Sequence, residues 1–203
     1  MLNRACAEFF GTGMMVFLGC YSIKLGYSNL IISATFGIAV FLDILLLRNT
    51  SGAHINPAVS IAFYRSKHLE KQALLIYIIA QILGGLCGAI FVGKYGFTEF
   101  KVNIGYGIIT EIFITFILMS SIYLIITITD KTSIVSIWVG SVVGILALIF
   151  GRYTGASMNP ARTFGPNVIS NELSHIPTFF ISTIIGALLA AELYNLIKNK
   201  VKN

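Results

Sequence analysis

The tripeptide Asn-Pro-Ala occurs twice in this chain, and the two copies stand 103 residues apart. The same offset relates Glu8 to Glu111, Phe10 to Phe113, Thr12 to Thr115, Gly37 to Gly140, and Gly52-Ala53 to Gly155-Ala156. In each half, 48 residues separate the first glutamate from the Asn-Pro-Ala asparagine. A register that holds without a net gap through most of each half indicates an internal duplication. We therefore predict one domain over residues 1–203, built from repeats at about 1–100 and 101–203.

Composition indicates that these repeats lie in a lipid bilayer. Of the 203 residues, 56% are hydrophobic and only 11% are charged, against about 25% charged residues in soluble domains. Apolar runs of roughly 20 residues, the length that crosses a bilayer, recur along the chain. We predict transmembrane helices at Arg4–Tyr21, Leu30–Leu47, Lys71–Gly93, Ile104–Ile128, Ile134–Ile149 and Ile176–Ile197. Three spans in each repeat would invert the second repeat relative to the first. A soluble all-α protein would need polar helix faces that these segments lack.

The distribution of basic residues predicts the orientation in the membrane. With a cytoplasmic N-terminus, the inside carries Arg4, Arg48, Arg65, Lys67, Lys71, Lys131, Lys198, Lys200 and Lys202, and the outside carries Lys24, Lys94, Lys101, Arg152 and Arg162. The inner excess agrees with the positive-inside rule. We therefore expect an integral membrane protein with both termini in the cytoplasm, in a plasma membrane or bacterial inner membrane. The net charge of +6 is then explained by topology, and no nucleic-acid partner is expected.

Each Asn-Pro-Ala copy, Asn56-Pro57-Ala58 and Asn159-Pro160-Ala161, predicts the start of a helix. Asparagine caps a helix N-terminus, and proline at the first helical position lacks only a donor that would be unpaired anyway. The stretch that holds each copy is too short to be both a loop and a full crossing. Each copy is therefore expected to begin a half-helix near the middle of the membrane. Irregular backbone at that depth occurs only where it is buried in protein or lines a wet cavity.

The two motif segments resemble the signature loops of the aquaporin (major intrinsic protein) family. The matching segments are Ser51–Val59 and Met158–Pro166, and Ala7–Thr12 resembles the first-helix motif of that family. The resemblance implies six tilted transmembrane helices and two re-entrant half-helices around one pore, in a homotetramer. Together with the repeat, this predicts an all-α membrane protein of the aquaporin type with inverted internal repeats.

In such a channel the motif residues act through hydrogen bonds and electric fields. Asn56 and Asn159 would cap the half-helices and direct their amide donors into the pore. Two helix N-termini that face each other place partial positive charge at the pore centre, which opposes the entry of protons and cations. This function needs no acid–base chemistry. The sequence also shows no nucleophile–base pair, metal-ligand spacing or phosphate loop, so we expect no catalytic residue, cofactor or metal.

Several charged residues lie inside the predicted apolar spans and motif segments. For Glu8 and Glu111 the family resemblance implies that they accept hydrogen bonds from the backbone of the re-entrant loops, while direct contact with the solute is the alternative. Arg162 breaks the repeat, because the equivalent residue of the first half is Val59. The resemblance places this arginine in an outer selectivity filter.

By offset from the motifs, the other members of that filter are Phe36, Ala147 and Ala156. Strictly water-selective members of the family usually carry histidine where this chain has Ala147, so a wider and less polar filter is expected. Other features differ from glycerol facilitators, which usually carry aspartate at the position of Thr163 and tryptophan near that of Phe36. The only tryptophan, Trp138, lies elsewhere in the sequence.

We predict a passive channel for water and small neutral solutes such as glycerol or urea. The alternatives are a strict water channel, an ion or proton pathway suggested by the acidic residues in the spans, and a structural protein with no useful flux. Asp43 lies two helical turns after Phe36. It could line the inner pore, face another protomer, or pair with a donor such as His54. We predict a hydrogen-bonded structural carboxylate.

Overall fold

The computed structural model describes residues 1–202, and this part of the chain forms eight helices. The helices are α1 (Leu2–Lys24), α2 (Asn29–Ser51), α3 (Pro57–Arg65), α4 (Lys71–Val92), α5 (Ile104–Ile128), α6 (Thr132–Thr154), α7 (Pro160–Ser170) and α8 (Ile176–Lys202). Six of them are long and apolar enough to cross a membrane, whereas α3 and α7 have only 9 and 11 residues. The predicted fold class is therefore confirmed.

The greatest error in the predicted spans concerns α6. We expected the shortest helix there, ending at Ile149, but α6 has 23 residues and continues to Thr154. The helix ends only where Gly155 adopts the left-handed conformation, with φ of +79°. In the first repeat, α2 likewise ends at Gly52, with φ of +90°. A glycine that can adopt positive φ sets each helix end, and the preceding polar residues stay helical.

Glycine-rich contacts bring the long helices close together. An ideal Cβ on Gly37 of α2 would lie 2.7 Å from the carbonyl oxygen of Gly140 on α6, and one on Gly140 would lie 2.6 Å from that of Gly37. The same kind of contact joins α1 to α4, where a Cβ on Gly84 would collide with the carbonyl oxygen of Phe9. Small residues of this kind allow helix backbones to approach within a membrane.

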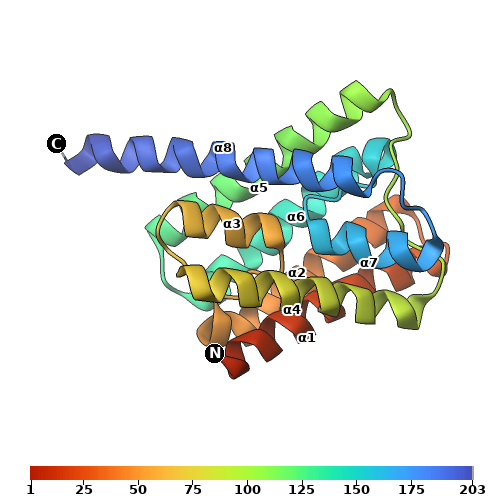
Figure 1. The fold of residues 1–203 in the computed structure, drawn as a ribbon, viewed down its shortest axis with the longest axis horizontal. Coiled ribbons are helices and arrows are strands. Elements are labelled where there is room, and N and C mark those ends of the chain that lie inside the picture. Colours follow the sequence, from red (N-terminus) through yellow and green to blue (C-terminus); the bar gives the residue numbers. More distant parts are fainter. Residues whose placement is uncertain (203) are drawn as a thin grey trace.

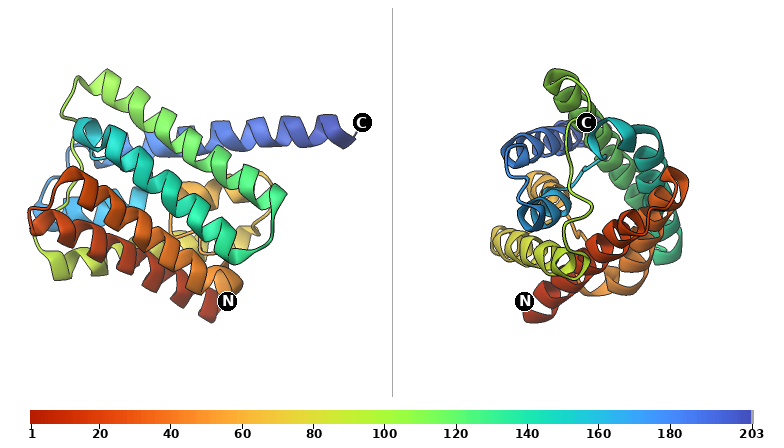
Figure 2. Two further views of the ribbon diagram at one scale, coloured as in Figure 1. Left: turned by 180° about the vertical axis from the view of Figure 1, so that it is seen from behind. Right: turned by 90° about the vertical axis from the view of Figure 1, so that its right-hand side faces the viewer.

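The two short helices lie between α4 and α8, as the ribbon views show (Figures 1 and 2). The main packing pairs are α1 with α4, α5 with α8, and α2 with α6. In both figures α1 and α5, the first helices of the two repeats, run in opposite directions. This arrangement is the inverted repeat that an odd number of spans in each half requires.

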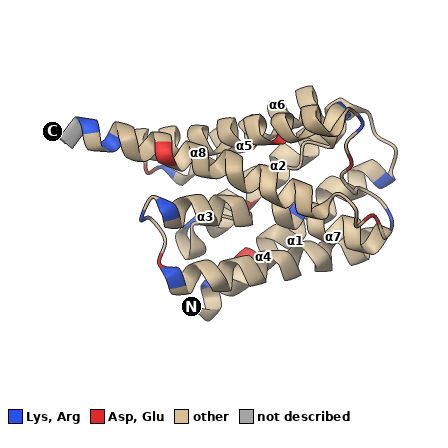
Figure 3. Ribbon diagram, turned by 45° about the horizontal axis from the view of Figure 1, so that its top comes forward, with Lys and Arg blue, Asp and Glu red and all other residues tan. Residues whose placement is uncertain are grey.

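Charged residues are concentrated at the two ends of the long helices (Figure 3). Both termini lie at the same end of the molecule (Figure 1), as six spans require. The exceptions inside the molecule are four buried groups, namely the carboxylates of Glu8, Asp43 and Glu111 and the guanidinium of Arg162. These four groups, and the residues that contact them, lie in the interior of the protein.

Candidate functional site

The centre of the molecule is formed by the two asparagines at the starts of α3 and α7. The side-chain oxygen of Asn56 accepts from the N–H of Ala58, and that of Asn159 accepts from the N–H of Ala161, each at 2.9 Å. Both asparagines are buried, with 5% and 4% of their surface exposed. The N-termini of the two half-helices are thus capped from within the protein.

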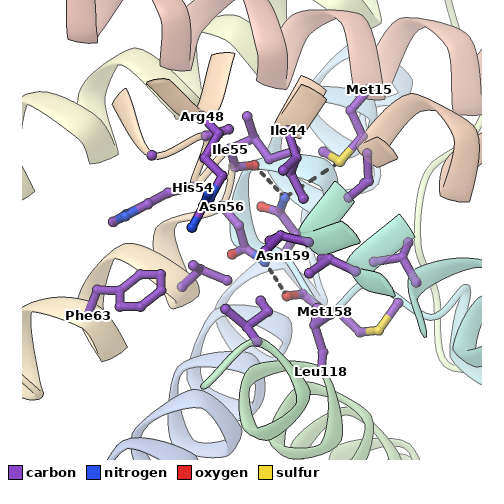
Figure 4. Close-up of a pocket in the computed structure, with 18 of the residues that line it drawn as sticks. Met15, Ile44, Arg48, His54, Ile55, Asn56, Phe63, Leu118, Met158 and Asn159 are labelled. Atoms are coloured by element: carbon purple, nitrogen blue, oxygen red, sulfur yellow. Dashed lines mark hydrogen bonds between the residues drawn. The ribbon is translucent and has the colours of Figure 1, made fainter. Parts of the chain in front are cut away.

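The same asparagines also bind each other's loops, which the sequence did not predict. The Asn56 amide donates to the carbonyl oxygen of Met158, and the Asn159 amide donates to that of Ile55, both at 2.8 Å (Figure 4). Ile55 and Met158 both have positive φ, of 44° and 51°. Such a conformation is rare for residues other than glycine and asparagine. Here these loop residues provide the carbonyl groups that receive the asparagine amides.

Glu8 holds the loop that precedes α3. Its Oε1 accepts from the backbone N–H of His54 at 2.9 Å and from the Ser51 hydroxyl at 2.7 Å. Its Oε2 accepts from the N–H of Ile55 at 2.6 Å and from the Gln81 amide at 2.8 Å. The carboxylate thereby satisfies two backbone donors that no helix pairs.

Glu111 makes the equivalent contacts in the second repeat. Its Oε1 accepts from the N–H of Ser157 and its Oε2 from the N–H of Met158, both at 2.9 Å. The Thr154 hydroxyl also donates to Oε1. Glu8 and Glu111 are fully buried, and neither is among the described residues that line the central cavity. Their geometry therefore favours contact with the loops over contact with a solute.

A cavity of about 400 Å³ passes both asparagines and follows α2 from Phe36 to Arg48. Twelve residues of helix span ~18 Å, more than half the thickness of a bilayer core. Most of the wall is aliphatic, from residues such as Val40, Ile44, Leu118, Ile122, Val139 and Val143. Polar groups are placed at the middle and at the two ends. Such a space suits a solute that passes through rather than one held by many contacts.

The four residues of the predicted filter all belong to the wall of this cavity. Phe36, Ala147, Ala156 and Arg162 all line it. Arg162 is buried, with only 4% of its surface exposed. Its Nη1 donates to the carbonyl oxygen of Gly96 at 2.6 Å, and its Cζ lies 4.9 Å from the centre of the Phe36 ring. Among the described side chains Arg162 forms no ion pair, so its charge remains available to the cavity.

Two large side chains near Ala147 are directed elsewhere. Phe150 packs edge-on against Phe113 on α5, with ring centres 6.1 Å apart. The Tyr153 ring lies 4.6 Å from the guanidinium of Arg152. Neither Phe150 nor Tyr153 is among the described residues that line the cavity. The small side chain of Ala147 is therefore not compensated by either of these aromatic neighbours.

The prediction for Asp43 is wrong. Asp43 is fully buried, and neither of its oxygens has a hydrogen-bond partner among the described residues. It does not line the cavity, because it faces α1, where an ideal Cβ on Gly11 would lie 3.4 Å from its Oδ1. The proposed partner His54 places its Nδ1 3.1 Å from the Ser60 hydroxyl instead. Asp43 thus stands where the second repeat has the apolar Leu146, with no polar group to receive it.

The cavity wall also includes residues to which the sequence assigned no role. His68 and Tyr194 line it, together with Arg48 and Asp130. The His68 Nδ1 lies 2.9 Å from the Ser66 hydroxyl. Partial burial and the nearby charge of Lys198 lower the pKa of His68, so the ring is neutral at pH 7. Nothing in the sequence around His68 distinguishes it from an ordinary loop histidine.

The described residues contain no cluster of three or more metal-ligating side chains. Six spans, two half-helices that meet inside the protein and a long cavity past their N-termini define a membrane channel. The family model for the major intrinsic proteins matches residues 1–194. The chain therefore belongs to the major intrinsic protein family, whose members are membrane channels and not enzymes.

Individual relatives are similar over most of this chain. Aquaporin-4 of Mus musculus is 36% identical over 93% of the chain, and aquaporin NIP1-1 of Zea mays is 32% identical over 97%. The matched regions are 65% and 75% of the lengths of those two proteins. The aquaglyceroporin from Plasmodium falciparum has the same fold, with a TM-score of 0.86, 22% identity and 95% of each chain covered.

Proposed function

We propose that this protein is a passive channel for water and small neutral solutes such as glycerol or urea, and that it excludes protons and ions. One observation carries the proposal. A single cavity is lined both by the two Asn-Pro-Ala asparagines and by the four residues of the predicted filter. A solute that follows this cavity must pass the paired half-helix ends and the Arg162 side chain.

Partial positive charge at the centre of the pathway opposes the passage of cations and protons. The N-termini of α3 and α7 each carry about half a positive charge from the helix dipole. Each asparagine amide has two N–H groups, of which one binds the opposite loop carbonyl, and the Asn159 amide nitrogen also lies 4.0 Å from the Met15 sulfur, a weak acceptor (Figure 4). The other can donate to a passing water, whose own hydrogens then turn away from the asparagines. This orientation interrupts a continuous donor chain, so water moves without carrying protons.

The filter determines the range of solutes. Arg162 supplies charged donors and Phe36 an apolar ring, which suit the hydroxyl groups and the carbon edge of a small alcohol. Ala147 and Ala156 add little volume opposite them. The names of the relatives, which include aquaporins and an aquaglyceroporin, do not determine the solute of this chain. The small side chains in the filter therefore carry the proposal of glycerol or urea flux.

Stopped-flow light scattering of proteoliposomes tests the proposal. Shrinkage in a sucrose gradient reports water, and recovery of volume in glycerol or urea reports the solute. We expect both signals to exceed those of empty liposomes. Water flux without solute flux would identify a strict water channel. Ion conductance in planar bilayers would instead support the ion pathway, which the fixed charge of Arg162 opposes.

Introducing histidine at position 147 should narrow the filter. The Ala147→His ring would add volume and a donor opposite Arg162, and should lower the ratio of glycerol to water permeability. We expect a decrease of roughly fivefold to tenfold, which corresponds to about 1 to 1.4 kcal/mol of added barrier. Both permeabilities are measured on the same vesicles, which cancels differences in the amount of protein. An unchanged ratio would show that Ala147 does not face the solute.

We also propose that both termini are cytoplasmic and that the protein is a homotetramer in a plasma membrane or bacterial inner membrane. The excess of basic residues at the end that carries the termini supports the orientation (Figure 3). The tetramer rests on the family resemblance. Exposed apolar side chains on the outer helix faces, such as Phe10, Ile38 and Phe113, suit contact with lipid or with a second protomer.

A further inference from the structure

The position of the Arg162 guanidinium depends on one loop carbonyl. Its Nη1 donates to the oxygen of Gly96, the only side-chain hydrogen bond recorded for its guanidinium among the described residues. Gly96 lies in the connection 93–103 between α4 and α5, which has no regular secondary structure. A carbonyl in such a segment is held in place only by the bonds that tether the segment. The geometry of the filter is therefore determined partly by whatever fixes this loop.

Asn167 on α7 fixes the loop two residues beyond Gly96. Its side-chain oxygen accepts from the backbone N–H of Thr98, and its amide donates to the carbonyl oxygen of Thr98, each at 2.9 Å. The amide also donates to the carbonyl oxygen of Glu172 at 3.0 Å. Asn167 is fully buried, and Thr98 is 1% exposed. One side chain thus satisfies both backbone groups of a loop residue, as a neighbouring strand would.

The opposite side of the loop packs on α1. Gly96 has φ of +81°, and an ideal Cβ built on it would lie 2.5 Å from the sulfur of Cys20. The Cys20 thiol lies 3.7 Å from the Gly96 carbonyl oxygen. The segment is therefore held between Cys20 on one side and Asn167 on the other. Movement of Thr98 away from α7 would release the Gly96 carbonyl and, with it, the guanidinium.

The comparison of the two repeats supports a connection between Asn167 and Arg162. Applying the 103-residue offset, the equivalent of Arg162 is Val59 and the equivalent of Asn167 is Tyr64. Tyr64 is an exposed residue, with 40% of its surface accessible. The first repeat thus lacks both the cation and the buried amide. The second repeat has both, five residues apart on one half-helix.

We propose that Asn167 is a positioning residue of the filter, which holds the loop carbonyl that orients the Arg162 guanidinium. The inference rests on the proposed function, in which Arg162 belongs to the filter. Asn167 does not line the cavity and acts through Thr98, Gly96 and Arg162 in turn. Its loss should therefore loosen solute selection only when Arg162 is present.

A double-mutant cycle tests this dependence. The glycerol-to-water permeability ratio is measured for wild type, Asn167→Ala, Arg162→Val and the double variant in proteoliposomes. We expect Asn167→Ala to raise the ratio by roughly threefold in the wild-type background and to leave it unchanged in the Arg162→Val background, since the effects of residues linked in one hydrogen-bond network are not additive. Thr183→Val is the matched control, because its buried hydroxyl bonds only within α8, at 2.7 Å to the Phe179 carbonyl.

The outcomes distinguish this inference from the proposed function. An unchanged ratio in folded Asn167→Ala, or the same increase in both backgrounds or in the control, would overturn the positioning role. If Arg162→Val alone leaves the ratio and the ion leak unchanged, the proposed filter itself fails. If Asn167→Ala does not reach the vesicles, Thr98→Val replaces it in the same cycle. That variant keeps the two backbone bonds to Asn167 but loses the 2.9 Å contact with the Thr163 hydroxyl and the 3.2 Å bond from the Thr98 hydroxyl to the Asn167 side-chain oxygen. A smaller increase that also requires Arg162 is therefore expected.

Discussion

Replacing Arg162 with valine should raise proton leak and glycerol flux while water flux stays within the same order of magnitude. The Arg162→Val substitution gives the second repeat the residue of the first, Val59, so the backbone should accept it. It removes the fixed cation that opposes positive solutes and the bulk that faces Phe36. We expect an increase of about tenfold in leak, which corresponds to about 1.4 kcal/mol of lost barrier. A pH-sensitive dye inside the vesicles measures the leak.

Arg152→Val provides the matched control for this experiment. Arg152 is also an arginine, in the last turn of α6, but it contacts Tyr153 and does not line the cavity. The same change of charge and volume there should alter neither leak nor solute ranking. If the two valine variants behave alike, the effect of Arg162 reflects the overall surface charge, and the proposed filter is wrong.

Two buried carboxylates of the first repeat should respond to leucine in opposite directions. Glu8→Leu leaves the backbone N–H groups of His54 and Ile55 without an acceptor. It should lower the free energy of unfolding by roughly 1–3 kcal/mol for each unpaired N–H group. Asp43→Leu removes an acid without partners and introduces the side chain that the second repeat has at Leu146. It should stabilise the protein by about 1–3 kcal/mol, the usual cost of an unsatisfied buried polar group.

Thermal denaturation in detergent compares the two variants with wild type. For a chain of this size 1 kcal/mol corresponds to about 2–4 °C, so Asp43→Leu should melt several degrees higher and Glu8→Leu well below wild type. Water permeability of Asp43→Leu should remain normal, because Asp43 does not line the cavity. A lower melting temperature for Asp43→Leu would mean that this carboxyl makes a stabilising interaction, for example with a buried water.

The features that followed from local sequence were predicted well. The half-helices begin at Asn-Pro because a side-chain cap and a proline at the first helical position act within one turn. The apolar runs gave three spans in each half, and the duplication then supplied the inverted relation between the two halves. The end of α6 was misplaced because Gly151 and Arg152 look like a loop, whereas the helix stops only at Gly155.

What could not be predicted depends on contacts between distant segments. Asn167 and Thr98 are 69 residues apart, and no periodicity or motif relates them. The environment of Asp43 depends on which side of α2 faces α1, and a shared helix face with Phe36 suggested the cavity instead. The bonds from each asparagine to the opposite loop also require the tertiary fold. Sequence patterns pointed to four filter residues, which line one cavity, without showing what holds them in place.

The hydrogen bonds from each asparagine to the opposite loop have a consequence for the order in which the protein forms during synthesis. The donor Asn56 and its acceptor Met158 are 102 residues apart, so the ribosome has completed the first repeat long before the second can bind it. Until then no opposite loop exists, and the first half-helix has nothing to face. The conducting path can therefore form only after the second repeat has been synthesised. Because the cavity wall takes residues from both repeats, a chain that stops after the first repeat cannot form this cavity.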